Sequence, residues 1–232
     1  MLVARVTPGK NASPSTARGM RVNSATGGVT IGGLPWLDYV LASPRRAARL
    51  AKEHKENYLS TESMAWFPYQ PLLSGMRRAV NAVDPRAELD EVVAWGEMKQ
   101  DWRAAAYRDS ASGFLELLPR RATGVPVVRP VWSEGDLSVV FRSVVGLRLR
   151  DDSLMLVAPY VKKAELDRDA AEVVLFIMES VMDQALPGAV PVVWDTRRGK
   201  AFKLTKRTNR RNLEVAARGL AAKYLCEWSL VA

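Results

Sequence analysis

A change of sequence pattern near residue 125 restricts the fold more than any other feature. Before it, apolar residues recur every three or four positions, which is the period of amphipathic helices. After it, segments such as "VPVVRPVW" and "SLMLVAPYV" are rich in valine, leucine and aromatic residues and alternate in part, as strands do. We therefore predict an α+β protein, with a helical N-terminal half followed by a mixed β-sheet C-terminal half with two packed helices.

The region 38–119 is predicted to hold three or four helices. The segment "ASPRRAARLAKEHKENYL" begins with an N-cap serine and a proline at the first helical position. A long helix is predicted from Asp84 to near Gly113, because its large apolar residues recur at helical spacing. On the apolar side of the first helix, His54 is interpreted as a partly buried histidine rather than a catalytic base, since no matched partner is evident.

The region 120–232 is predicted to run β-β-β-α-β-β-α, with "DDS" as the turn between two of its strands. Its first helix has a capping-box arrangement at Asp169 and Glu172. The strand "AVPVVWD", the turn "TRRG", the strand "KAFKLTK" and a last helix from about Asn209 follow. This region is either one domain with 38–119 or a separate domain, and both alternatives stay open.

Residues 1–37 are predicted to form a flexible basic arm. They hold basic residues and no acid, with serine, threonine, glycine and proline dense between them. Because no continuous apolar stripe runs through most of the segment, we expect a mobile terminus or an arm that orders on a nucleic-acid backbone or a partner subunit. A protein partner or self-association through this arm is therefore expected alongside a nucleic-acid partner.

Composition restricts the classes of function. The 34 Lys and Arg outnumber the 25 Asp and Glu, which favours attraction to polyanions such as nucleic acid. One cysteine, Cys226, excludes an intramolecular disulfide, and a single histidine leaves too few ligands for a structural zinc site. The start of the sequence lacks a signal-peptide core, and the most apolar segment carries acidic residues. We expect no membrane partner, a cytoplasmic location and no cofactor.

The segment "TRRGKAFKLTKRTNRR", residues 196–211, holds eight basic residues and no acid. If its flanking strands pair as a hairpin, Arg197 and Arg198 occupy the tip, and the last basic residues fall at a helix N-terminus, which favours an anion. Phosphate contacts of this kind position a nucleic acid without reading its bases. The alternative is a solvated hairpin with an incidental charge run. The predicted nucleic-acid-binding residues are Arg197, Arg198, Lys200, Lys203, Lys206, Arg207, Arg210 and Arg211, assisted by a helix face of Arg45, Arg46 and Arg49.

A metal-dependent nuclease or related phosphotransfer enzyme, with Mg²⁺ as its cofactor, is the alternative function. Glu97 and Lys99 form an E-x-K after an apolar run, with Asp84 and Asp90 upstream, and this spacing resembles the acid pair and lysine of the PD-(D/E)XK nucleases. That chemistry needs the E-x-K on a core strand. The helical periodicity here instead favours a helix, which would put Glu97 and Lys99 on different sides.

A second candidate metal site centres on Asp195, at the end of the strand "VPVVWD", with Asp151, Asp152 and Lys200 as companions. An aspartate at a strand end is also an ordinary turn residue, and that interpretation is favoured. The sequence has no phosphate-binding loop, dinucleotide fingerprint or nucleophile elbow, so no catalytic residue is assigned. A second alternative function is a structural or assembly protein of a phage or mobile element, whose basic arm and hairpin contact a partner subunit.

Overall fold

The computed structural model describes residues 28–59, 68–99 and 101–231. The part of the predicted arm before residue 28 lies outside the described residues. The helices are α1 (Gly33–Val40), α2 (Pro44–Leu59), α3 (Gln70–Ala79), α4 (Pro85–Glu97), α5 (Arg103–Leu117), α6 (Arg168–Ser180), α7 (Met182–Ala185) and α8 (Arg210–Leu230). The strands are β1 (Val29–Gly32), β2 (Thr123–Val125), β3 (Val131–Glu134), β4 (Leu137–Val140), β5 (Val145–Arg148), β6 (Leu154–Tyr160), β7 (Val190–Asp195) and β8 (Lys200–Phe202).

These strands form two sheets. The larger has the order β2-β5-β6-β7-β8, in which β6 and β7 are parallel and the other neighbours are antiparallel. Helices α6 and α7 carry the chain from β6 to β7, as a parallel connection requires. The smaller sheet has the order β1-β4-β3, with β1 parallel to β4. The predicted α+β class with a mixed sheet is confirmed.

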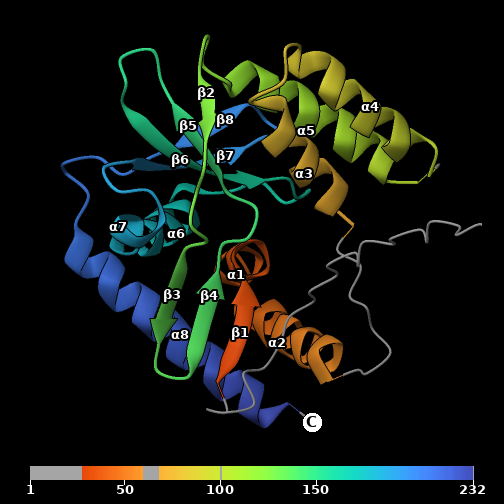
Figure 1. The fold of residues 1–232 in the computed structure, drawn as a ribbon. Helices are drawn as coiled ribbons and strands as arrows, with labels where there is room; N and C mark the ends of the chain where they lie inside the picture. The colour runs from red at the N-terminus through yellow and green to blue at the C-terminus, as the bar shows by residue number, and fades with distance from the viewer. Residues whose placement is uncertain (1–27, 60–67, 100, 232) are drawn as a thin grey trace, which may run out of the picture.

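The larger sheet is buried on both faces (Figure 1). On β7, Val192 and Trp194 pack in one core cluster with α3, α4 and α5. Val193, which points to the other face, packs in the cluster that contains α1, α6 and α8. In Figure 1 these two groups of helices lie on opposite sides of the sheet. The helices of the first half and the strands of the second half therefore share a hydrophobic core.

The predicted long helix from Asp84 to Gly113 is wrong, because the helix is interrupted between the end of α4 and the start of α5. The Asp101 carboxylate accepts a hydrogen bond of 2.8 Å from the Arg103 amide at the start of α5. Trp102, which the helical periodicity had placed on the apolar stripe, is 50% exposed. The helical spacing of large apolar residues continues across α4 and α5, so the sequence predicted one helix where there are two.

The predicted helix end at Gly113 is also wrong, since α5 continues to Leu117. Glycine is required here by close packing rather than by a helix end. A Cβ at Gly113 would lie 1.9 Å from the carbonyl oxygen of Thr196. Helix α5 therefore lies directly against the backbone of the segment that links β7 to β8.

The arm boundary at residue 37 is corrected as well. Strand β1 pairs with β4, and helix α1 follows it at once. Ile31 is 1% exposed and Trp36 is fully buried in the core. Residues 29–37 therefore belong to the folded protein. In "VTIG" the apolar residues alternate toward the core, but four residues between glycines are too few for this alternation to identify a strand from sequence.

The three strands predicted before the first helix of the second half are wrong, because five strands, β2 to β6, precede α6. The segment "LSVVFRSVVGLRLR" divides into β4 and β5, which belong to different sheets.

Three local predictions can be compared directly with the structure. The turn at "DDS" joins β5 to β6, with Asp152 at a φ of 62°. Asn209 caps α8, its side chain accepting from the Asn212 amide. The cap of α6 is Asp167 rather than Asp169, and its carboxylate accepts from the Ala170 amide at 2.7 Å.

Candidate functional site

The turn of residues 196–199, between β7 and β8, is held against the body of the protein. The amide and the hydroxyl of Thr196 both donate to the Tyr160 carbonyl at 3.0 Å. Gly199 has a φ of 59°, a left-handed conformation that favours glycine at the end of the turn. Thr196 is fully buried. The expected hairpin is confirmed, with Arg197 and Arg198 in the turn between β7 and β8. The turn is not a free tip, however, because α5 and the end of β6 cover it.

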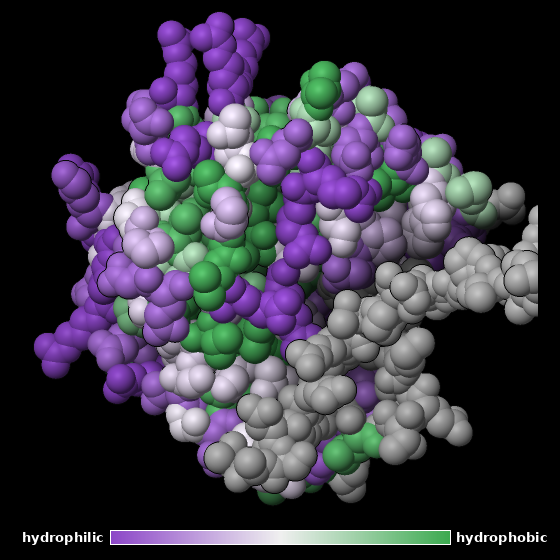
Figure 2. All heavy atoms as spheres, in the orientation of Figure 1, coloured by the Kyte–Doolittle hydropathy of each residue, from purple (hydrophilic) through white to green (hydrophobic). Residues whose placement is uncertain are grey.

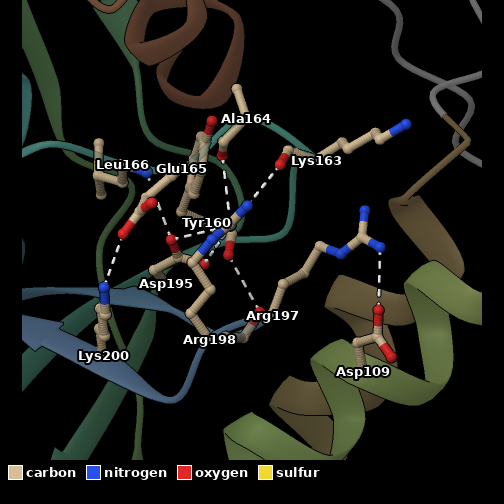
Figure 3. A network of polar contacts seen from close by, with 11 residues as sticks. Asp109, Tyr160, Lys163, Ala164, Glu165, Leu166, Asp195, Arg197, Arg198 and Lys200 are labelled. Carbon is tan, nitrogen blue, oxygen red and sulfur yellow. Dashed lines mark hydrogen bonds and ion pairs between the residues drawn. The ribbon is translucent and has the colours of Figure 1, made fainter.

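An ion pair between buried Asp195 and partly buried Arg198 fixes the turn (Figure 3). Asp195 is fully buried, and the Arg198 guanidinium donates to both of its carboxylate oxygens at 3.1 and 3.2 Å. The same guanidinium donates to the carbonyls of Lys163 and Ala164, at 2.5 and 3.4 Å. Burial raises the pKa of Asp195, while the Leu166 amide and Arg198 lower it. Arg198 therefore joins the turn to the loop after β6.

Three further basic residues of the segment 196–211 bind carboxylates that come from other elements. Figure 3 shows two of these ion pairs, one to α5 and one to the loop before α6. The third ties the start of α8 to α6. The pairs are Arg197 with Asp109 at 2.9 Å, Lys200 with Glu165 at 2.6 Å, and Arg210 with Glu179 at 3.1 Å. Together with Arg198, half of the eight predicted residues have a structural partner, which local sequence could not reveal.

The other four residues form what we call the basic loop: Lys203, Lys206, Arg207 and Arg211. All are exposed, and none forms an ion pair within the described part of the chain. The Arg210 side chain donates to the carbonyls of Thr205 and Thr208, so it fixes the loop backbone between them. Because Asn209 already caps α8, the charge of this surface comes mainly from side chains rather than from free helix amides.

The basic face of α2 does not adjoin the basic loop. Helix α2 packs against the C-terminal part of α8, where His54 Nδ1 lies 3.2 Å from the Tyr224 hydroxyl. Arg211 lies at the other end of α8, about 20 Å along the axis. Ser43, which precedes α2, lines a shallow depression together with Arg45, Arg46 and Arg49 of this helix. Arg49 also pairs with Glu53. The two basic surfaces are therefore separate.

The E-x-K segment lies at a helix end, as the periodicity favoured, and not on a core strand. Glu97 is the last residue of α4 and pairs with Arg108 at 2.6 Å. Lys99 lies over the Trp95 ring, 4.8 Å from its centroid. Asp84 caps the opposite end of α4, about 20 Å away. The structure does not bring these residues together as a metal centre.

The acids of the second candidate metal site are also apart. Asp195 lies beside Tyr160 at the end of β6, whereas Asp151 and Asp152 precede the start of that strand, about 20 Å away. Lys200 is opposite Asp195 in the sheet, but its ammonium binds Glu165. Within residues 28–59, 68–99 and 101–231, no three acidic, histidine or cysteine side chains gather in a way that could hold a metal.

No protein-family model matches the chain, and no curated sequence matches it significantly. Among the helices that the structure describes, none has the length and apolar character needed to span a membrane. The case for function therefore rests on the charge and geometry of the surface.

Proposed function

We propose that this protein binds nucleic acid through its phosphate backbone, and that the basic loop makes the contacts. One observation supports the proposal. The four residues of the basic loop stay exposed without an ion pair in the described residues, while the other four basic residues of the segment each meet a carboxylate. Four positive charges within nine residues attract a polyanion.

The chemistry of the basic loop suits phosphate contacts more than base recognition. Lysine and arginine side chains neutralise phosphates and release condensed counterions, which gives an affinity that depends steeply on salt. Because contacts to phosphates carry no base information, the binding is expected to be independent of base sequence. Such a partner accords with the cytoplasmic location that we expect from composition.

The test is a fluorescence titration of labelled single-stranded and double-stranded DNA and RNA at several salt concentrations. The variant replaces all four residues of the basic loop by glutamine. If each residue contacts one phosphate, the slope of log affinity against log salt becomes shallower by about 3 to 4 for a duplex. The fold is expected to be unchanged, because these side chains have no ion pair among the described residues.

The control variant removes the same charge elsewhere. It replaces Arg86, Arg120, Arg121 and Arg150, which are also exposed and make no ion pair in the described structure, by glutamine. Its salt slope is expected to change by about 1 or less. An equal change of the salt slope in both variants would mean that binding depends only on the net charge of the protein. No binding by the wild type at low salt would reject the proposal.

A further inference from the structure

A cleft on the face drawn in Figure 2 gathers three arginines that lie far apart in the sequence. It has a volume of about 350 Å³ and opens between α3, β2, the segment that links β2 to β3 and the segment that links β4 to β5. Arg77 comes from α3, Arg129 from the segment after β2, and Arg142 from the turn between β4 and β5. Figure 2 shows hydrophilic residues beside hydrophobic ones on this face, over β2 and α3.

The lining of this cleft carries three positively charged side chains. None of the described residues that line it is an aspartate or a glutamate. The charges that act on Arg77 are those of Arg129 and Arg78, and with burial they lower its pKa. Burial and Arg129 likewise lower the pKa of Arg142. Three positive side chains that line one cleft attract an anion.

Hydrogen bonds hold one arginine and one edge of the cleft in place. Arg77 donates to the Arg142 carbonyl and to the Ser74 hydroxyl, both at 3.2 Å. The Gly124 amide donates to the Asn81 side chain at 2.9 Å, so β2 is fixed against the end of α3. The Arg77 guanidinium is thereby positioned before any ligand arrives, which lowers the entropy cost of binding.

Apolar residues form another part of the lining, together with Asn81. They include Val80, Val127, Phe141 and Val144, beside the three arginines. Small-molecule sites are typically clefts of about 300 to 1,000 Å³ with apolar walls and a few charged groups that fix orientation. The cleft thus combines a strongly cationic part with a surface for an uncharged organic group.

We propose that the cleft of Arg77, Arg129 and Arg142 binds a phosphate monoester that carries an apolar or aromatic group. A phosphate monoester is close to a dianion at neutral pH and has three terminal oxygens, which matches three guanidinium groups better than a carboxylate does. Planar guanidinium forks bind such oxygens in pairs. Phe141 and the valines would contact the organic part.

The experiment is calorimetric titration of the full chain with phenyl phosphate in a low-chloride buffer. Inorganic phosphate and benzoate are titrated in parallel. Phenyl phosphate is expected to bind at least about tenfold more tightly than either, since one competitor lacks the ring and the other lacks the second charge. This comparison also separates a phosphorylated ligand from free phosphate.

The matched variants are Arg129→Met and Arg150→Met. Arg129 is exposed, and no hydrogen bond or ion pair is recorded for it in the described chain, so its loss should leave the fold intact. Arg129→Met is expected to weaken phenyl phosphate binding about tenfold, and Arg150→Met, outside the cleft, to leave it unchanged.

Two outcomes would overturn the inference. One is no binding of phenyl phosphate, or equal binding of benzoate, by the wild type. The other is an equal effect of the two variants, which would indicate general electrostatics. The inference does not rest on the proposed function, because the glutamine variant of the basic loop is expected to retain phenyl phosphate binding in full.

Discussion

Replacing Arg198 by methionine is expected to destabilise the protein strongly, although it only removes one charge from a basic segment. Asp195 is fully buried, and the remaining donor to its carboxylate would be the Leu166 amide at 3.4 Å. Breaking a buried ion pair on one side costs about 3 to 5 kcal/mol, because the other charge stays buried. The change also removes the hydrogen bonds to the carbonyls of Lys163 and Ala164.

Protonation of Asp195 sets an upper limit on this cost. Raising the pKa of a carboxyl from 3.8 to 7 costs about 4 kcal/mol. We therefore expect a loss of about 3 to 4 kcal/mol at pH 7. In the variant the folded pKa lies well above the unfolded one, so the stability linked to this group is present at low pH and is lost as pH rises. The destabilisation should accordingly shrink by up to about 1.4 kcal/mol for each pH unit toward pH 5.

The assay is urea unfolding followed by tryptophan fluorescence and circular dichroism at pH 7 and pH 5. Lys203→Met is the control, because it removes an exposed charge and should change the free energy of unfolding by about 0.5 kcal/mol or less. The double variant Asp195→Asn with Arg198→Met should be less destabilised than the single variants predict together. A loss under about 1 kcal/mol for Arg198→Met at pH 7 would refute the argument that half of the basic segment is structural.

Two further predictions concern stability. Gly113→Ala should destabilise the protein by about 1 to 3 kcal/mol, because the new Cβ would meet the Thr196 carbonyl. Gly219→Ala, with no atom within 4 Å of the new Cβ, should instead stabilise α8 by up to about 1 kcal/mol. An equal change of the free energy of unfolding in the two variants, measured in urea, would contradict the close packing of α5 on the turn. Burial and Lys162 lower the pKa of His54 from 6.5 to about 4, so the unfolded chain takes up a proton that the folded chain does not as pH falls through that window. The difference of about 2.5 pKa units corresponds to about 3 kcal/mol of folding stability that is lost between pH 7.5 and pH 4. His54→Gln should abolish this loss when the free energy of unfolding in urea is measured across that pH range. An unchanged pH profile in the variant would mean that His54 is solvated in the folded state.

Patterns that depend on neighbours in sequence were predictive. The change near residue 125, the strand "VPVVWD" and the start of the last helix near Asn209 each reflect local sequence patterns, and the structure has them where expected. The break between α4 and α5 was missed because the same apolar spacing continues through it. Strand β1 was missed because four residues carry a weak alternation, and its stability comes from pairing with β4.

The candidate site depends on contacts that sequence does not display. Arg197, Arg198 and Lys200 look free in a segment without acids, yet their partners come from α5, the end of β7 and the loop before α6. Likewise, nothing near Arg77 in the sequence indicates that Arg129 lies in the same cleft. Local charge density predicted a basic surface, and the fold alone determined which charges remain available.

The pairing of β1 with β4 bears on how the chain folds as it is made. Val29 pairs with Leu137, so about 100 residues separate the partners. At about 5 to 20 residues per second, β1 leaves the ribosome roughly 5 to 20 s before β4 exists. Helix α8, which packs on α2, is completed later still. The apolar residues of the N-terminal segment therefore stay uncovered until β4 and α8 have been synthesised. During this time the segment is exposed to chaperones and to association with other chains.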